Sequence, residues 1–134
     1  MRIKSDPQLN TNENSSHTLV LCVYQVKDKS MFEQLSTNED GIYQLLDCEP
    51  FHDSVTAAKR LIVQPNQDLT FVMDRMEKTK NLGIAAGYFK LEKNRITRIF
   101  DIPVTIVSRS KAQVEPLNVF VSLGAQQIVG AEVQ

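Results

Sequence analysis

The apolar residues of this sequence lie in short segments rich in Val, Ile, Phe and Tyr, with turn-forming residues between them. This pattern is typical of an all-β protein, because β-branched and aromatic side chains suit strands while Gly, Pro, Asn and Asp favour turns. Eight segments are predicted to be strands: residues 2–5, 19–26, 57–64, 68–73, 81–91, 96–104, 116–123 and 127–133. The 134 residues suffice for one core, so we expect a single domain over residues 1–134.

Two of the segments indicate how the strands pack. Residues 19–26 are apolar on both faces as far as Gln25, as expected of a central strand. In residues 116–123 the apolar side chains alternate and share one face, which carries Leu117, Val119, Val121 and Leu123. Together the segments predict a β-sandwich.

Residues 30–48 depart from the strand pattern and are predicted to form two short helices. Ser30 and Glu33 have the spacing of a capping box, and Ile42 and Leu46 recur at helical spacing. Helices this short do not persist alone in water. We therefore expect them to pack on the sandwich through Phe32, Leu35, Ile42 and Leu46.

Composition and motifs exclude several classes of function. The net charge is −1 and neither sign forms a block, which argues against a nucleic-acid partner. No apolar run is long enough to span a membrane, and the sequence does not open with a signal peptide. We therefore expect either a cytoplasmic protein or a mature fragment without its targeting segment.

No set of residues has the spacing of a catalytic or metal site. His52, Asp53 and Ser54 are adjacent, whereas a hydrolytic triad is assembled from distant positions. The alternating asparagines near the N-terminus lack the glycine and the final glutamate of a calcium loop. The carboxylates between residues 39 and 53 cluster around the predicted helices, where solvation and the helix dipole account for them. We expect no enzymatic activity, no metal and no cofactor.

The two cysteines, Cys22 and Cys48, do not have metal-binding spacing. One lies in the middle of a predicted strand and the other at the end of a predicted helix, so nothing requires their Cα atoms to approach within disulfide range. We predict two free thiols.

A polar stretch, "SDPQLNTNENSSHT", separates the first two predicted strands. If those strands are antiparallel neighbours, the loop is longer than the two to five residues, roughly, that would join them. Its Asn and Ser side chains offer hydrogen bonds, Pro7 stiffens its base and Leu9 offers one apolar anchor. The residues alone leave two interpretations open: a tolerated surface loop or a binding loop.

The order of several short motifs resembles the outer-membrane lipoprotein family of type VI secretion systems (TssJ-like). The run over residues 6–26, which ends in "VYQV", has that family's loop-and-strand pattern, and Phe32 follows at the start of the helical insert. Gln64 and Pro65 close a strand as in the family, although Asn66 replaces the usual glycine. "NLGIAAGYF" matches a family strand through Leu82, Gly83, Ala85 or Ala86, and Phe89. The resemblance covers nearly the whole chain.

The resemblance implies a transthyretin-like sandwich of two four-stranded sheets with a helical insert at about residues 30–48. It also implies a periplasmic position, with an acylated cysteine anchoring the protein to the outer membrane; no such cysteine precedes Arg2. The implied partner is the periplasmic C-terminal region of the IcmF-like inner-membrane subunit, bound through the loop of residues 6–17. The implied partner-binding residues are Asp6, Pro7, Gln8, Leu9, Asn10, Thr11, Asn12, Glu13, Asn14 and Ser15.

Two alternatives remain open at this point. A transthyretin-like or immunoglobulin-like ligand-binding module would favour exposed aromatic residues on one sheet face, where Phe120 is the apolar break on the outward side of its segment. A hydrolase of the transthyretin-related kind would need converging histidines on inner strands, but His17 and His52 both lie outside the predicted strands.

Overall fold

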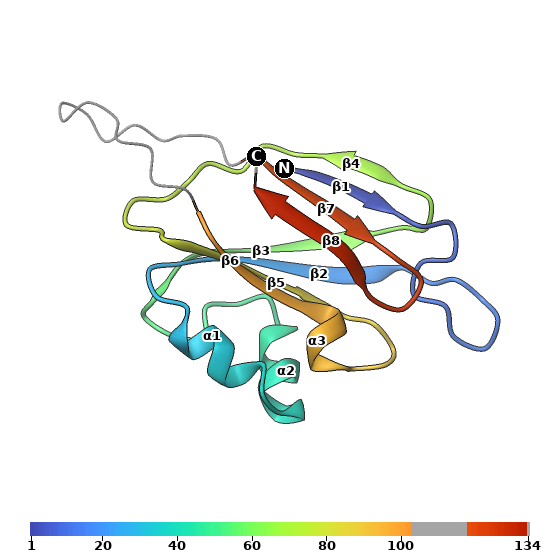
Figure 1. Cartoon of the computed structure of the whole chain (residues 1–134), viewed down its shortest axis with the longest axis horizontal. Helices are drawn as coiled ribbons and strands as arrows, with labels where there is room; N and C mark the ends of the chain where they lie inside the picture. The colour runs from blue at the N-terminus through green and yellow to red at the C-terminus, as the bar shows by residue number, and fades with distance from the viewer. Residues whose placement is uncertain (103–117, 134) are drawn as a thin grey trace.

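The computed structural model describes residues 1–102 and 118–133, and these residues form eight strands in two four-stranded sheets (Figure 1). The first sheet has the order β4-β1-β7-β8, with bounds Asp68–Thr70, Arg2–Ser5, Val119–Leu123 and Ile128–Val133. The second has the order β3-β2-β5-β6, with bounds Val55–Val63, Leu19–Val26, Asn81–Ala86 and Thr97–Asp101. The predicted all-β sandwich of two four-stranded sheets is confirmed.

Strand β1 pairs with β4 and β7 and not with β2, so the condition under which the loop between β1 and β2 was compared with a short hairpin connection does not hold. Ile3 in β1 lies opposite Val121 in a parallel pair with β7 and opposite Leu69 in an antiparallel pair with β4. Strand β1 has four residues, of which only Ile3 is buried, and such a short pattern fits an edge or an inner place in either sheet. The sequence of β1 alone therefore does not determine which strand it pairs with. The β1–β2 loop (residues 6–18) therefore crosses from one sheet to the other.

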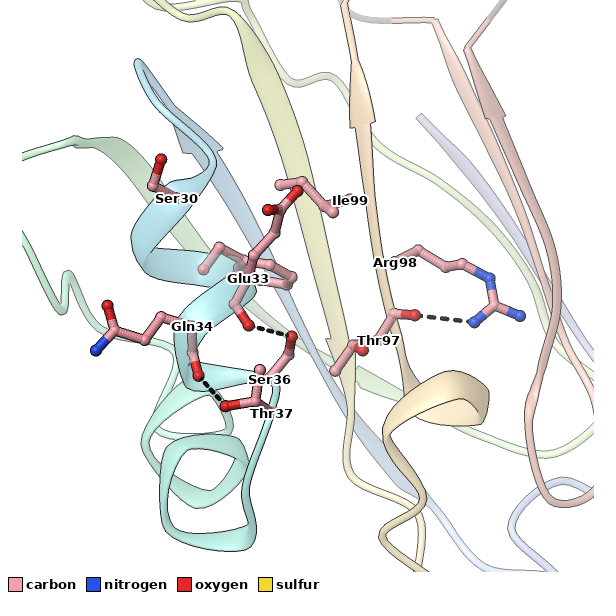
Figure 2. A pocket seen from close by; sticks show the side chains of 9 residues that line it. Ser30, Glu33, Gln34, Ser36, Thr37, Thr97, Arg98 and Ile99 are labelled. Carbon is pink, nitrogen blue, oxygen red and sulfur yellow. Dashed lines mark hydrogen bonds between the residues drawn. The ribbon is translucent and has the colours of Figure 1, made fainter.

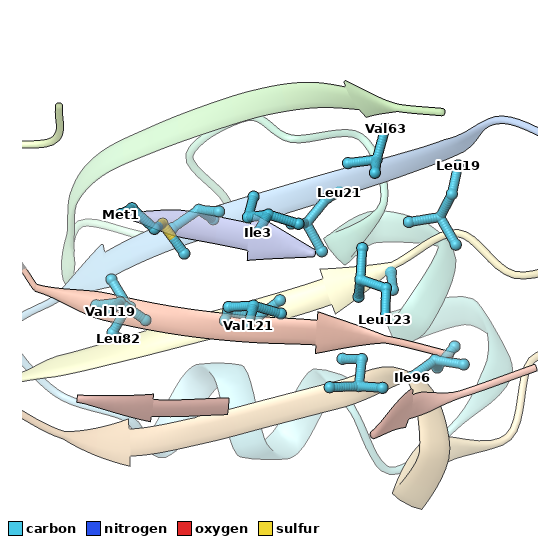
Figure 3. Close-up of a cluster of buried hydrophobic side chains, with 14 of the residues drawn as sticks. Met1, Ile3, Leu19, Leu21, Val63, Leu82, Ile96, Val119, Val121 and Leu123 are labelled. Atoms are coloured by element: carbon cyan, nitrogen blue, oxygen red, sulfur yellow. The ribbon is translucent and has the colours of Figure 1, made fainter. Parts of the chain in front are cut away.

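The core lies between the two sheets (Figure 3). Ile3 and Val121 from the first sheet meet Leu21, Leu82 and other side chains of the second, and all four are fully buried. Strands β2 and β5 are the two inner strands of their sheet and are buried along almost their whole length. The predicted central position of residues 19–26 is confirmed, and Leu117, from the predicted inward set of the β7 segment, lies outside the described residues.

Two helices, α1 (Ser30–Leu35) and α2 (Glu39–Leu45), cover the outer face of the second sheet (Figure 1). Phe32 packs directly over Gly83 of β5, where a Cβ atom would lie 2.6 Å from the Phe32 ring. Ile42 and Leu45 are buried, whereas Leu46 is only half-buried, so α2 is rotated slightly from the predicted packing face. Leu35 is half-buried.

The predicted capping box of α1 is wrong. The residue before this helix, Lys29, already has helical dihedral angles and makes no capping hydrogen bond with its side chain. The backbone N–H of Ser30 instead donates to the Asp28 carboxylate, and Glu33 pairs with Lys29 at 3.8 Å. Because the helical geometry begins one residue early, Ser30 lies inside the first turn and cannot act as its cap.

The predicted free thiols are also wrong, because Cys22 and Cys48 form a disulfide with their Cα atoms 4.9 Å apart. Cys22 points to the outer face of β2, which the helices cover, and the chain turns back onto that face after α2. Cys48 makes this turn with a left-handed φ of 58°. The Tyr24 hydroxyl donates to the Leu45 carbonyl oxygen at 2.6 Å and fixes the same end of α2. The helical insert is therefore tied to β2 by a covalent bond and a buried hydrogen bond.

Gln25 has a fully buried amide that holds the β4–β5 connection (residues 71–80). Its nitrogen donates to the Asp74 carbonyl oxygen at 2.8 Å, and its oxygen accepts from the Met76 N–H at 2.8 Å and from the Thr79 hydroxyl at 3.2 Å. Of the adjacent residues in the sequence "VYQ", Tyr24 therefore holds the helical insert and Gln25 holds the β4–β5 connection.

Several boundaries of the elements differ from prediction; for example, β5 ends at Ala86 although residues 81–91 were predicted as one strand. Strand β4 is shorter than residues 68–73, and the predicted turn before β6 is the short helix α3 (Lys93–Ile96). The end of the segment predicted as 96–104 lies beyond the described residues. At the β3–β4 turn, Asn66 has a φ of 57°, which explains how it stands in for a glycine.

Candidate functional site

The base of the β1–β2 loop is fixed to three other parts of the chain. The Asn10 side chain donates to the Thr18 carbonyl oxygen and accepts from the Phe89 N–H, both at 3.0 Å. The Thr11 N–H donates to the Ala125 carbonyl oxygen at 3.0 Å, in the turn between β7 and β8. The Asn66 N–H donates to the Asp6 carbonyl oxygen at 3.1 Å. These bonds make the loop base part of the folded sandwich.

Leu9 is fully buried and belongs to the core between the sheets, so the predicted use of Leu9 as an apolar anchor for a partner is wrong. Asn10 is also buried, with a φ of 51°. A single leucine in a polar stretch has no periodicity that would reveal this burial in the sequence. Burying it contributes about 2 kcal/mol to stability, so Leu9 holds the loop to the sandwich.

The tip of the loop, residues 11–16, is a small hairpin. The backbone groups of Asn12 and Ser15 exchange two hydrogen bonds, at 2.9 and 3.1 Å. Between them, Glu13 and Asn14 have φ values of 52° and 63°. Two central residues with positive φ are the pattern of a type I′ turn, which ordinarily prefers Asn-Gly. The side chains of residues 12–16 are exposed, so the hairpin presents a row of polar groups to solvent.

The structure thus divides the ten predicted binding residues into two groups. Leu9 and Asn10 are buried, whereas eight remain at least partly accessible: Asp6, Pro7, Gln8, Thr11, Asn12, Glu13, Asn14 and Ser15. The first three of these eight lie in the loop base, where the Asp6 carboxylate accepts from the Gln8 N–H at 2.7 Å. The other five belong to the hairpin.

Phe89 lies directly beside the loop and is not among the residues that were predicted to bind a partner. Its side chain is 58% exposed, and its ring meets the His17 ring edge-to-face with centroids 4.9 Å apart. With Asn12 and Gln126 it lines a hollow of about 240 Å³ between the loop tip and the β7–β8 turn. No local pattern marks this contact, because the loop and Phe89 are far apart in the sequence.

Tyr88, next to Phe89, holds the β7–β8 turn in place. Its hydroxyl oxygen lies 2.9 Å from the carbonyl oxygens of both Gly124 and Gln127, and the single hydroxyl proton is shared between these two acceptors. Burial, with a smaller contribution from the Asp6 carboxylate, raises the pKa of this hydroxyl. The turn, the loop base and the segment around Phe89 therefore form one fixed surface at this end of the sandwich (Figure 1).

Other sequence candidates do not assemble into a site. The His52 and Ser54 side chains bond to each other at 3.0 Å within a local turn, and His17 lies with the loop. Within the described ranges, no three His, Cys, Asp or Glu side chains are placed to hold a metal ion. No helix in this part of the chain is long and apolar enough to cross a membrane.

A second hollow, of about 500 Å³, lies between α1 and β6 (Figure 2). Two of its hydroxyl groups bond to the end of α1: Ser36 donates to the Glu33 carbonyl oxygen at 2.8 Å and Thr37 to that of Gln34 at 2.6 Å. These bonds cap the C-terminal end of α1. The positions of the Ser36 and Thr37 hydroxyl groups are therefore explained by the helix itself and do not indicate a bound ligand. The loop therefore remains the better candidate.

Comparison with known proteins places this arrangement in context. A family model described as "Type VI secretion lipoprotein, VasD, EvfM, TssJ, VC_A0113" matches residues 1–123. No curated protein matches the sequence.

Several solved structures share the fold at low sequence identity. A crystal structure of the type VI secretion lipoprotein TssJ1 from Pseudomonas aeruginosa is 18% identical with a TM-score of 0.75, covering 99% of this chain and 92% of that chain. A chain in a structure of the TssM C-terminal domain (869-1107) from EAEC is 17% identical with a TM-score of 0.70, and the match covers 100% of this chain and 94% of that chain. Lip from Serratia marcescens, a membrane-bound component of the type VI secretion system, is 12% identical with a TM-score of 0.70, covering 99% and 93%.

Proposed function

The chain belongs to the type VI secretion lipoprotein family, whose members include VasD, EvfM and TssJ, and from this premise we propose that it docks the outer membrane to the IcmF-like inner-membrane subunit, TssM. In this proposal an N-terminal lipid anchor holds the protein at the periplasmic face of the outer membrane. The partner surface is the periplasmic C-terminal region of TssM. The binding element is residues 6–15 of the β1–β2 loop, apart from the buried Leu9 and Asn10, and the role is structural rather than catalytic.

The geometry of the loop tip carries the proposal. Glu13 and Asn14 occupy a left-handed backbone conformation that costs most residues about 1–2 kcal/mol and that glycine would adopt without strain. Both residues instead keep a side chain, and both side chains are exposed. Asparagine adopts this conformation more readily than most residues, so the cost falls mainly on Glu13, and residues held in such a conformation are found at binding sites more often than elsewhere. A fixed base and an exposed polar hairpin together suit recognition by another protein.

The position of the loop on the sandwich suits docking toward the inner membrane. Strand β1 starts at the N-terminus and runs toward the end of the sandwich from which the β1–β2 loop projects (Figure 1). Any segment that precedes β1 therefore joins the chain at the end of β1 that is farther from the loop. A lipid anchor attached there would point the loop away from the outer membrane and toward the inner-membrane subunit.

The fold comparison supports the identity of the partner. A chain with this fold occurs in a structure of the TssM C-terminal domain, at a TM-score of 0.70, and another occurs in a structure of the type VI membrane complex, at a TM-score of 0.68. These likenesses favour TssM as the partner in this proposal.

The test is titration calorimetry of loop variants against the periplasmic C-terminal region of TssM. The variant replaces residues 12–15 by Gly-Gly and leaves Leu9 and Asn10 in place, because both are buried. We expect binding to be lost while circular dichroism reports an unchanged fold. The matched control is Lys78→Gly, an exposed residue with a φ of 68° in the β4–β5 connection. Undiminished affinity in the folded loop variant would refute the proposal.

A further inference from the structure

We propose that the TssM-binding surface extends from the loop tip across Phe89 to Tyr43 of α2, with Phe89 as its main apolar contact. This inference rests on the proposed function, because it takes the same periplasmic region of TssM as the occupant. The surface is called the Phe89 face below and comprises the loop tip, Phe89, Tyr43 and the two hollows that Phe89 lines.

The loop tip alone is too small and too polar to form a stable interface. Stable protein–protein interfaces use roughly 20–30 residues on each side, whereas the tip spans residues 11–16. The residues that contribute most to binding are enriched in aromatic side chains, and the one large apolar residue of the loop, Leu9, is buried. A partner that binds the tip must therefore contact neighbouring elements as well.

Phe89 is an exposed apolar residue that contacts the loop directly. Its backbone N–H donates to the Asn10 side chain at 3.0 Å and its ring packs on His17, so its position is fixed relative to the tip. A phenyl ring left 58% exposed in a fixed position is ready to enter an apolar recess of a partner without further ordering.

The hollow on the loop side of Phe89 suits a side chain better than a small molecule. Its volume of about 240 Å³ lies below the roughly 300–1,000 Å³ of typical ligand pockets. Its walls offer the amide groups of Asn12 and Gln126 beside the phenyl ring. A polar side chain of TssM in this hollow would bond to the amides while the ring covers it.

On its other side, Phe89 lines a different hollow, of about 440 Å³, that reaches α2. This hollow is separate from the one between α1 and β6. Tyr43 and Asn38 form the opposite wall, and the Tyr43 side chain is 55% exposed. Phe89 thus joins the loop-side hollow to an exposed aromatic residue of the helical insert. The disulfide and the Tyr24 hydrogen bond hold α2 on the sheet, so both sides of the Phe89 face are rigid.

The experiment compares single variants by calorimetry against the TssM periplasmic C-terminal region. We expect Phe89→Ala to weaken binding at least tenfold and Tyr43→Ala at least threefold. The matched control is Val72→Ala, which changes a side chain that is 78% exposed in the β4–β5 connection and should leave the affinity unchanged. His17→Ala separates a direct contact from support of the loop: it removes the partner of the Phe89 ring but should weaken binding less than threefold.

The outcomes distinguish this inference from the proposed function. If the Gly-Gly loop variant loses binding but Phe89→Ala and Tyr43→Ala do not, docking is confined to the loop and the inference is wrong. An equal loss in His17→Ala and Phe89→Ala would also overturn it, because Phe89 would then act by holding the loop. Self-association that Phe89→Ala abolishes, with unchanged affinity for TssM, would assign the face to a second copy of this chain. Full binding by the loop variant would refute the proposed function itself.

Discussion

Removal of the Cys22–Cys48 disulfide is expected to destabilise the protein by about 3.5 kcal/mol. The bond joins residues 26 apart in the sequence. In the chain-entropy description, closing a loop of that length removes about 12 cal/mol/K of conformational entropy from the unfolded chain, which is ~3.5 kcal/mol at 25 °C. Both cysteines are buried, so a Cys22→Ala/Cys48→Ala variant should also lose a small amount of packing.

The assay is urea denaturation of three samples: oxidised wild type, wild type with a thiol reductant, and the double alanine variant. The reduced wild type and the variant should both unfold at lower urea than the oxidised protein, by amounts that agree within about 1 kcal/mol. Thiol titration of unfolded, unreduced wild type should find no free thiol. A loss below about 1 kcal/mol, or two titratable thiols, would refute the reasoning.

Three further changes test how the insert and the β4–β5 connection are held. Gly83→Ala should cost about 1–3 kcal/mol in denaturation experiments, because the new methyl group meets the Phe32 ring at 2.6 Å and the ring must shift; an unchanged midpoint would contradict this packing. Gln25→Leu should cost about 2–3 kcal/mol and speed amide exchange in residues 74–79, because it leaves buried groups without their partners; slow exchange there would contradict that role. Burial raises the pKa of Tyr24 from 10.0 to about 12. The neutral Tyr24 hydroxyl therefore stabilises the fold fully below pH 10, and this contribution is lost as the pH rises toward 12. Between pH 10 and 12 a Tyr24→Phe variant should lose less stability than wild type, and equal losses would contradict this role of the hydroxyl.

Local sequence patterns were sufficient to predict most strands and both helices of the insert. Alternation in β7 and continuous apolar character in β2 report burial directly, because each residue's face follows from its neighbours. The Asn38 side chain accepts from the Gly41 N–H at 2.7 Å and starts α2 in the way that short polar residues favour. These features depend on contacts within a few residues.

Features that depend on distant contacts could not be predicted in the same way. The parallel pairing of β1 with β7 joins the two ends of the described chain, and nothing in residues 2–5 encodes it. The disulfide required a turn at Cys48 that carries the chain back over β2. Leu9 was predicted to be an exposed anchor but is buried in the core, and no local pattern revealed that Phe89 would lie exposed beside the loop.

The central claim is that the end of the sandwich carrying the β1–β2 loop binds TssM. The most direct measurement is an NMR titration of the isotope-labelled protein with the unlabelled periplasmic C-terminal region of TssM. The account predicts that shifted amide signals cluster at residues 11–17, around Phe89 and in the β7–β8 turn, while signals of the β4–β5 connection stay in place. Shifts that cluster instead on the outer face of the first sheet, or around α1 and β6, with the loop signals unmoved, would contradict it.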